Sequence, residues 1–430
     1  MTGEAHLGQT ELVADDLVRR AVPRKVRPSF ESAARRLALL VAAQGDAPAF
    51  EIVEGARSYR IGRGDPVAHV DVLDPRFYRA VLRSGSVGLG ASYVAGWWDA
   101  DDLTAFLRAL FSRVKPLIAH LDRLGPALSV VLDVPSRLAA PRAADDRANV
   151  RAHYDVSNDF FELMLDETMT YSCALFENPN MSLAQAQLAK IDRLCVKLEL
   201  RPGDRLVEVG SGWGSFALHA AGKYGVRVTT TTLSQAQLGY VEKRVAEAGL
   251  ADRVTVLGED WRDLQGHFDK LVSVEMIEAV DWRHHDEFLA KCSELLVEDG
   301  LSALQAIVID DRSFERTKRH EDFISRMVFP GGCLPSVASL SASLTRATDL
   351  RIVDLEDMGS HYAATLRRWA ANLAGREGEL QRLGISTEFR RLWALYLAYC
   401  QAAFLEGHVS DVQVLLAKPS HKRRLAPRVA

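Results

Sequence analysis

The spacing of apolar and polar positions changes near residue 188, and this change predicts two regions in the chain. From there on, short apolar runs alternate with helical segments. The strand candidates are 205–209, 226–231, 253–257, 269–274 and 301–309. Strands that alternate with helices are typical of a mostly parallel sheet covered by helices. We therefore expect an α/β, doubly wound domain over residues 146–430.

The preceding residues show a different pattern. Residues 15–43 and 103–131 have helical periodicity, while 48–73 alternate in part and contain turn signals. Residues 139–148 are rich in Ala, Pro and charges, which is typical of a linker. These features predict a separate mixed α/β domain over residues 1–145. Near the other end, the pattern predicts helices over 313–329 and 364–407 and a closing strand at 412–417.

Composition narrows the class of protein. The chain has 430 residues, enough for two domains, with 48% apolar and 26% charged residues. A net charge of −4 gives no general attraction to nucleic acid. Five scattered cysteines form no C-x-x-C pair and no zinc spacing, so we expect no metal and a reducing, cytoplasmic compartment. The polar first residues and the lack of an apolar run of about 18–20 residues predict neither a secretory signal nor a membrane-spanning segment.

A glycine-rich turn offers the first candidate chemistry. Gly210, Gly212 and Gly214 follow the first predicted strand and precede a helical segment. Glycines allow a tight turn and a close approach of the backbone to a ligand. The spacing differs from the dinucleotide fingerprint G-x-G-x-x-G and is closer to the E-x-G-x-G-x-G signature of methyltransferases that bind S-adenosylmethionine. A turn with only a structural role is the alternative.

Polar residues at the ends of successive strands complete a candidate cofactor site. Glu208 ends the first strand, where a carboxylate balances ligand charge or orders the turn. After the third strand, Asp260 is placed to accept a hydrogen bond from an adenine amine, and Trp261 to stack on the ring. Caps and loop residues are the alternative reading. Hydroxyls and an amide follow the second strand, where a ribose contact is expected: Thr232, Ser234 and Gln237.

Beyond these residues, the chain resembles the cyclopropane fatty acid synthase family. The similarity runs from about residue 85 to 417 and includes the segments 90–99, 153–161, 169–176, 274–280 and 329–336. It implies a class I methyltransferase fold, Rossmann-like, after an N-terminal lipid-binding domain. It also implies that Tyr171 and Ser172 contact S-adenosylmethionine, whose methyl group passes to a cis double bond of a phospholipid acyl chain.

The resemblance further implies a bicarbonate ion as the base that removes a proton from the resulting carbocation. Position 305 departs from the best-known cyclopropane synthases, which have His there. Gln donates a hydrogen bond but does not titrate, which leaves two products open: a cyclopropane, or a methylene branch formed after a hydride shift. The site carries over to Cys173, Glu278, Gln305, Ile307 and Tyr362.

Several of these residues also fit a purely structural role. Cys173 fits a small core residue, Tyr362 a core aromatic and Glu278 a cap or an ion pair. Cys400 matches a cysteine proposed as catalytic in the family, but the reaction needs no covalent intermediate. It is therefore either a residue that lines the pocket or a chemical group.

The expected partners follow from a lipid substrate. Basic clusters within residues 12–40 favour contact with an anionic membrane surface, or else form a solvated face. We thus expect peripheral association with the inner face of the cell membrane. A methylene product would require a separate reductase. A homodimer stays open, as does the different class of a methyltransferase for a soluble small molecule.

Overall fold

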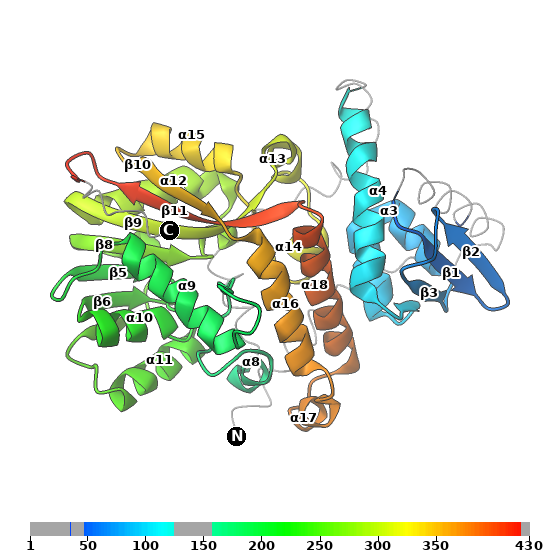
Figure 1. The fold of residues 1–430 in the computed structure, drawn as a ribbon, viewed down its shortest axis with the longest axis horizontal. Helices are drawn as coiled ribbons and strands as arrows, with labels where there is room; N and C mark the ends of the chain where they lie inside the picture. Colours follow the sequence, from blue (N-terminus) through cyan, green and yellow to red (C-terminus); the bar gives the residue numbers. More distant parts are fainter. Residues whose placement is uncertain (1–34, 36–46, 124–156, 423–430) are drawn as a thin grey trace.

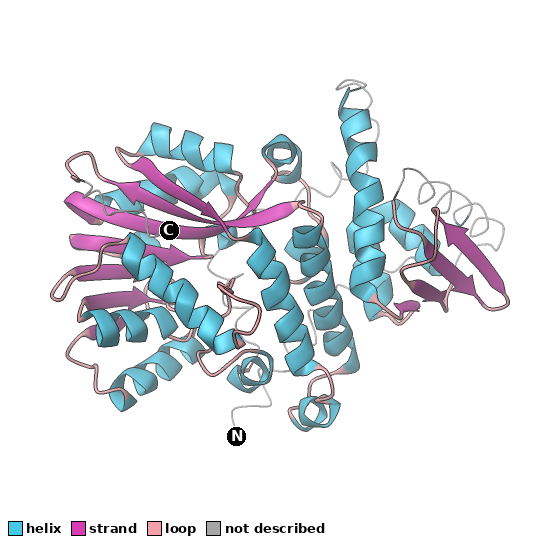
Figure 2. Cartoon of the chain, in the orientation of Figure 1, coloured by secondary structure: helices cyan, strands magenta, loops and turns pink. Residues whose placement is uncertain are grey.

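The computed structural model describes residues 35, 47–123 and 157–422. A large sheet with helices on its faces forms one side of the molecule, and a smaller sheet lies at the opposite end (Figure 1). Helices α16 (Gly359–Leu373), α18 (Thr387–Leu405) and α4 (Leu103–Arg123) lie between the two sheets. Figure 2 shows the same division into strands and helices.

The large sheet has seven strands in the order β10-β11-β9-β8-β5-β6-β7. All neighbouring pairs from β9 to β7 are parallel, whereas β11 runs antiparallel to both of its neighbours. This arrangement confirms the predicted α/β class. The strands are β5 (Arg205–Val209), β6 (Arg227–Thr231), β7 (Val254–Leu257), β8 (Phe268–Val274), β9 (Leu296–Ile309), β10 (Arg351–Asp357) and β11 (Val409–Ala417).

Two long helices expected from the sequence are interrupted. Asp322 caps a new helix within 313–329, giving α13 (Asp311–Thr317) and α14 (Phe323–Met327). Within 364–407, Gly375 and Gly384 take positive φ and end successive helices, so α17 (Glu377–Arg382) separates α16 from α18. The pattern also missed β10, an edge strand without a fully buried residue.

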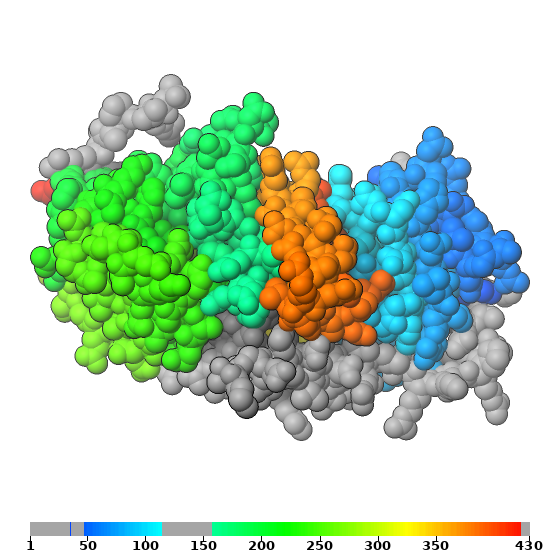
Figure 3. All heavy atoms as spheres, turned by 90° about the horizontal axis from the view of Figure 1, so that it is seen from below, coloured from blue at the N-terminus to red at the C-terminus, as the bar shows by residue number. Residues whose placement is uncertain are grey.

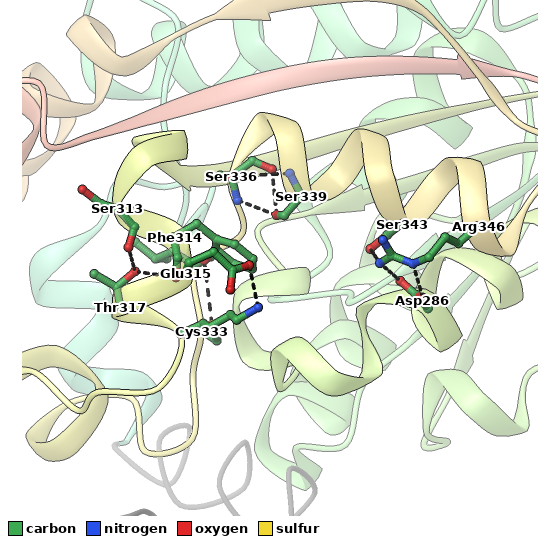
Figure 4. A network of polar contacts seen from close by, with 12 residues as sticks. Asp286, Ser313, Phe314, Glu315, Thr317, Cys333, Ser336, Ser339, Ser343 and Arg346 are labelled. Atoms are coloured by element: carbon green, nitrogen blue, oxygen red, sulfur yellow. Dashed lines mark hydrogen bonds and ion pairs between the residues drawn. The ribbon is translucent and has the colours of Figure 1, made fainter. Parts of the chain in front are cut away.

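The remaining helices pack around the large sheet. Arg346 of α15 forms a two-pronged ion pair with Asp286 of α12, and Ser336 and Ser339 cap the start of α15 (Figure 4). These contacts fix the two helices to each other. The elements are α8 (Asn158–Met164), α9 (Leu183–Lys197), α10 (Ser215–His219), a π-helix (Ala220–Tyr224), α11 (Gln235–Glu247), α12 (His285–Glu294) and α15 (Val337–Ala347).

The smaller sheet belongs to the N-terminal region. Its order is β2-β1-β3-β4, with β1 (Phe50–Glu54), β2 (Arg57–Ile61), β3 (His69–Val72) and β4 (Trp98–Ala100). Helix α3 (Arg76–Val94) follows β3. Trp98 is fully buried and packs against Tyr93 and Phe106, so these aromatic side chains form core.

The N-terminal region packs directly against the larger part. One hydrophobic core runs from the small sheet into α16 and α18. Arg391 of α18 donates to the carbonyl oxygens of Tyr93 and Trp98 and pairs with Asp99. In the space-filling view, the blue and cyan N-terminal region adjoins the orange α16–α17 segment (Figure 3). The predicted boundary at 145/146 lies outside the described residues, as does nearly all of 12–40.

No helix in the described ranges combines the length and apolar character needed to cross a membrane.

Candidate active site

A pocket opens where β5, β6 and β8 end. The carboxyl ends of parallel strands share one edge, and ligands bind there in open α/β sheets. Most predicted cofactor residues line this pocket, whereas Gly214 and Ser234 do not. Those that line it are Tyr171, Ser172, Glu208, Gly210, Gly212, Thr232, Gln237, Asp260 and Trp261.

The three glycines of the turn differ in what they face. All have positive φ, which favours glycine. A Cβ on Gly210 would lie 2.3 Å from Met276 Cγ, and one on Gly214 2.9 Å from Val241 Cγ1. Around Gly212, a Cβ would meet nothing within 4 Å. Packing and backbone conformation therefore account for Gly210 and Gly214, and only Gly212 has the open space that a close ligand approach needs.

The residues after β6 combine a helix cap with an unused donor. Ser234 accepts a hydrogen bond from Gln237 N and caps α11. Thr232 donates to Gln237 Oε1 at 2.8 Å, while Gln237 Nε2 is buried without a partner in the described structure. A buried amide that faces a pocket without a partner fits a ligand that accepts a hydrogen bond. This side chain supports a polar ligand in the pocket.

The residues that follow β7 make more contacts with the rest of the protein than those that follow β6. Asp260 caps a short helix (Trp261–Asp263) and pairs with Arg262 at 3.1 Å. Trp261 packs edge-on against Phe288 and under the Arg262 guanidinium. Both residues still line the pocket, so their cap and packing roles coexist with a position at a ligand.

Glu208 is the buried carboxyl group of this pocket. Thr230 Oγ1 donates to it at 2.6 Å. Burial raises the pKa of Glu208 to about 8, against the effects of this hydrogen bond and of Lys190. The group therefore changes its charge near neutral pH.

A second cluster lies beside the pocket, centred on Glu275 at the end of β8. Its Oε1 accepts from Cys173 N at 2.8 Å and from Gln305 Nε2 at 2.9 Å, and its Oε2 accepts from Tyr362 OH at 2.6 Å. Gln305 is itself oriented by Gln413, whose Nε2 donates to Gln305 Oε1 at 3.1 Å. Three residues predicted to hold an anion thus converge on a carboxylate of the protein.

The other two predicted anion ligands pair with each other. Ile307 N donates to Glu278 Oε1, and the second oxygen of Glu278 is buried without a partner in the described structure. Burial and then the charge of Glu275 raise the pKa of Glu278 to about 8. The cap or ion-pair reading of Glu278 does not match this contact, because it accepts a backbone N–H from β9.

The two candidate cysteines occupy different positions relative to the cluster and the pocket. Cys173 contributes its backbone N–H to the cluster, while its thiol is fully buried near Met358 O. Cys400 packs against the core from α18, outside the residues that line the pocket. Burial raises the pKa of both thiols, which disfavours the reactive thiolate.

Two further ionisable groups, Lys190 and Asp411, surround Glu275. Lys190 of α9 is fully buried and donates to Ser172 Oγ at 2.6 Å. Asp411 of β11 is fully buried, and a weak donor, the Cys173 thiol, lies beside its carboxyl group. Burial lowers the pKa of Lys190 and raises that of Asp411. The cluster therefore holds three carboxyl groups and one amine.

Sequence reasoning missed Glu275, Lys190 and Asp411, although signals existed. Glu275 follows strand β8 directly, at the same edge of the sheet where the predicted cofactor residues lie. Lys190 lies on the buried face of α9, between Ala186 and Leu194. A charged residue on an apolar face or at a pocket edge points to a function.

The sheet order and the pocket at its carboxyl edge identify the protein as an S-adenosylmethionine-dependent methyltransferase. A family model described as mycolic acid cyclopropane synthetase matches residues 142–414. The chain belongs to this family, as the sequence resemblance predicted.

Relatives and solved structures support this assignment. The chain is 38% identical over 350 residues to a tuberculostearic acid methyltransferase of Mycobacterium tuberculosis, covering 79% of this chain and 81% of the relative. It is 34% identical over 362 residues to the cyclopropane-fatty-acyl-phospholipid synthase of Escherichia coli, covering 83% and 89%. A mycolic acid cyclopropane synthase structure in complex with S-adenosylhomocysteine and CTAB matches with a TM-score of 0.59 and 34% identity, covering 63% of this chain and 98% of that one.

Proposed function

We propose that the protein transfers a methyl group from S-adenosylmethionine to the cis double bond of an unsaturated phospholipid acyl chain. The observation that carries the proposal is the adjacency of the cofactor pocket to the Glu275 cluster, with Glu275 lining both. An alkene is a weak nucleophile, so it must be held against the methyl donor with water excluded.

The surroundings of the cluster suit an apolar chain. Tyr362 stacks on Phe404, and the Tyr171 and Tyr396 hydroxyls lie 3.0 Å apart. These side chains belong to the aromatic core that continues into α18 and the N-terminal region. Such walls stabilise an acyl chain by apolar contact and offer few groups that would react with a carbocation.

The carbocation can give two products, and which one forms depends on whether proton loss or a hydride shift comes first. If a proton leaves the new methyl group first, the ring closes to a cyclopropane. If a hydride shifts first, proton loss gives an exomethylene branch. The resemblance to a tuberculostearic acid methyltransferase favours the second product, because tuberculostearic acid is methyl-branched. In that case a separate reductase completes the branch.

The test uses the purified full chain, S-adenosylmethionine and vesicles of an unsaturated phospholipid. We expect each modified acyl chain to gain the mass of one methylene group, and NMR to distinguish ring protons from exomethylene protons. Vesicles of a saturated phospholipid are the control. A preparation that binds S-adenosylhomocysteine but modifies no unsaturated lipid would contradict the proposal and favour a soluble small-molecule substrate.

Membrane association belongs to the same proposal. A phospholipid substrate requires contact with a bilayer surface, on the cytoplasmic side if the enzyme is cytoplasmic. We expect charge reversal at Arg20, Arg24, Lys25 and Arg27 to weaken binding to anionic vesicles. Unchanged binding with unchanged salt dependence would exclude this basic segment as the contact.

A further inference from the structure

We propose that Glu275 is the base that takes the proton from the methylated acyl chain, in place of a bound bicarbonate ion. This inference rests on the proposed function, since it assigns a residue to the last step of that reaction.

The donors expected to hold bicarbonate are already engaged. Cys173 N, Gln305 Nε2 and Tyr362 OH all donate to Glu275, at 2.6–2.9 Å. Ile307 N donates to Glu278. A second anion would lack donors and would lie beside a carboxylate, which is unfavourable in a buried site. The residues present therefore do not fit bicarbonate.

Hydrogen bonding indicates which carboxyl group of the cluster carries the charge. Glu275 accepts three hydrogen bonds and Glu278 accepts one from Ile307 N, whereas the carboxyl group of Asp411 has only the weak thiol donor of Cys173 among the described residues. Like charges close together in a dry site do not all ionise, and the group with the most donors is the most stable as an anion. Lys190 supplies the matching positive charge. Glu275 is thus the ionised member.

The backbone also holds Glu275 in place. Its φ is +52°, in the left-handed region that costs a non-glycine residue free energy. Glu275 N donates to Gln305 O at 2.8 Å, which fixes this turn at the end of β8. The turn directs the side chain to the edge of the cofactor pocket, beside Met276 and Gly210.

The step balances without another reactant. The carbon–sulfur bond of the methyl donor breaks as a carbon–carbon bond forms, which leaves a cation on the acyl chain. A Glu275 oxygen then takes a proton from the new methyl group. The electron pair of that C–H bond closes the ring, or forms the exomethylene double bond after a hydride shift. The proton passes from Glu275 to water before the next turnover.

The decisive variant is Glu275→Gly. Glycine adopts a φ of +52° readily, so the turn keeps its shape while the three donors become free for a small anion. We expect turnover to fall by about 10²-fold or more, as for loss of a general base. Added bicarbonate or formate then restores part of the rate. Wild-type turnover is unchanged when bicarbonate is removed from the buffer.

Two further variants separate chemistry from folding. Glu275→Gln keeps the size of the side chain, and we expect it to stay inactive with added formate. Glu298→Gln, an exposed acid outside the site, is the matched control. Both should bind S-adenosylhomocysteine as the wild type does. Wild-type turnover that requires bicarbonate, or an active Glu275→Gln, overturns the inference, whereas a wild type that modifies no lipid overturns the proposed function instead.

Discussion

The two halves of the active site are built in different ways. Apart from Tyr171 and Ser172, the residues of the cofactor half lie at the ends of the consecutive strands β5, β6 and β7, so each set is one βα unit from the next. The carboxylate half brings together α9, β8, β9, β11 and α16, which are distant in the sequence. The first half is readable from local motifs, whereas the second depends on the topology of the sheet. Variants on each side test this contrast.

The largest effect is expected for Lys190→Met in the carboxylate half. Removing the buried cation leaves Glu275 without its positive partner, which costs about 3–5 kcal/mol of unfolding free energy. Glu275 must be ionised to act, so activity is lost as pH falls through its pKa. Lys190 lowers the pKa of Glu275, so its removal moves the acid limb of the rate profile to higher pH.

Urea unfolding and a pH profile of turnover measure the two effects. Lys197→Met, on the same helix but paired with Asp354 and Glu356 outside the cluster, is the control. If Lys190→Met shifts neither the acid limb nor stability, then the cluster does not depend on this charge.

The next effect separates two glycines within the cofactor half. Gly210→Ala should cost about 2–4 kcal/mol of stability, through positive φ and the clash with Met276. Gly212→Ala should cost only about 1 kcal/mol, but it should weaken S-adenosylhomocysteine binding because its Cβ enters open space. Calorimetry and urea unfolding of both variants give the comparison.

Adding Met276→Ala to Gly210→Ala tests whether the clash with Met276 causes the loss of stability. The double variant should recover the part of the unfolding free energy that the clash removes. Equal effects of the two glycine variants on stability and on binding would contradict the distinction.

These contrasts show how far the sequence could predict the site. The strand-turn-helix order around Gly212 is local, and it predicted both the fold and the pocket edge. Asp411 reaches Glu275 only because β11 pairs with β9, and no spacing in the sequence encodes that pairing. The expectation of bicarbonate came from the family resemblance, which drew attention to the donors and away from Glu275. The sequence shows Gln305 as a departure from the family, but not that its side chain donates to Glu275, 30 residues away.

A moderate effect is expected where the N-terminal region meets α18. Arg391→Ala removes bonds to Tyr93 O, Trp98 O and Asp99, and the half-exposed Asp99 limits the loss to about 1–2 kcal/mol. Hydrogen exchange should rise in β4 while β5 stays protected. Arg390→Ala is the control, because its side chain donates to Ser386 O and Thr387 Oγ1 near the start of α18. Equal exchange in the two variants would show that Arg391 does not hold this interface.

The smallest effect concerns the charge of Glu208, which either balances a cationic ligand or orders the turn. Its pKa of about 8 means that ionisation increases from pH 7 to about pH 9. S-adenosylmethionine carries a sulfonium charge that S-adenosylhomocysteine lacks, while both share the same amino acid end. If Glu208 balances that charge, the affinity ratio of the two should rise a few-fold over this range, because an ionised carboxylate attracts the cation. Glu208→Gln should abolish the rise, and Glu242→Gln at an exposed site should preserve it. A ratio independent of pH in the wild type would instead leave Glu208 to order the turn through Thr230, and the cofactor half would then discriminate its ligands without a titrating charge.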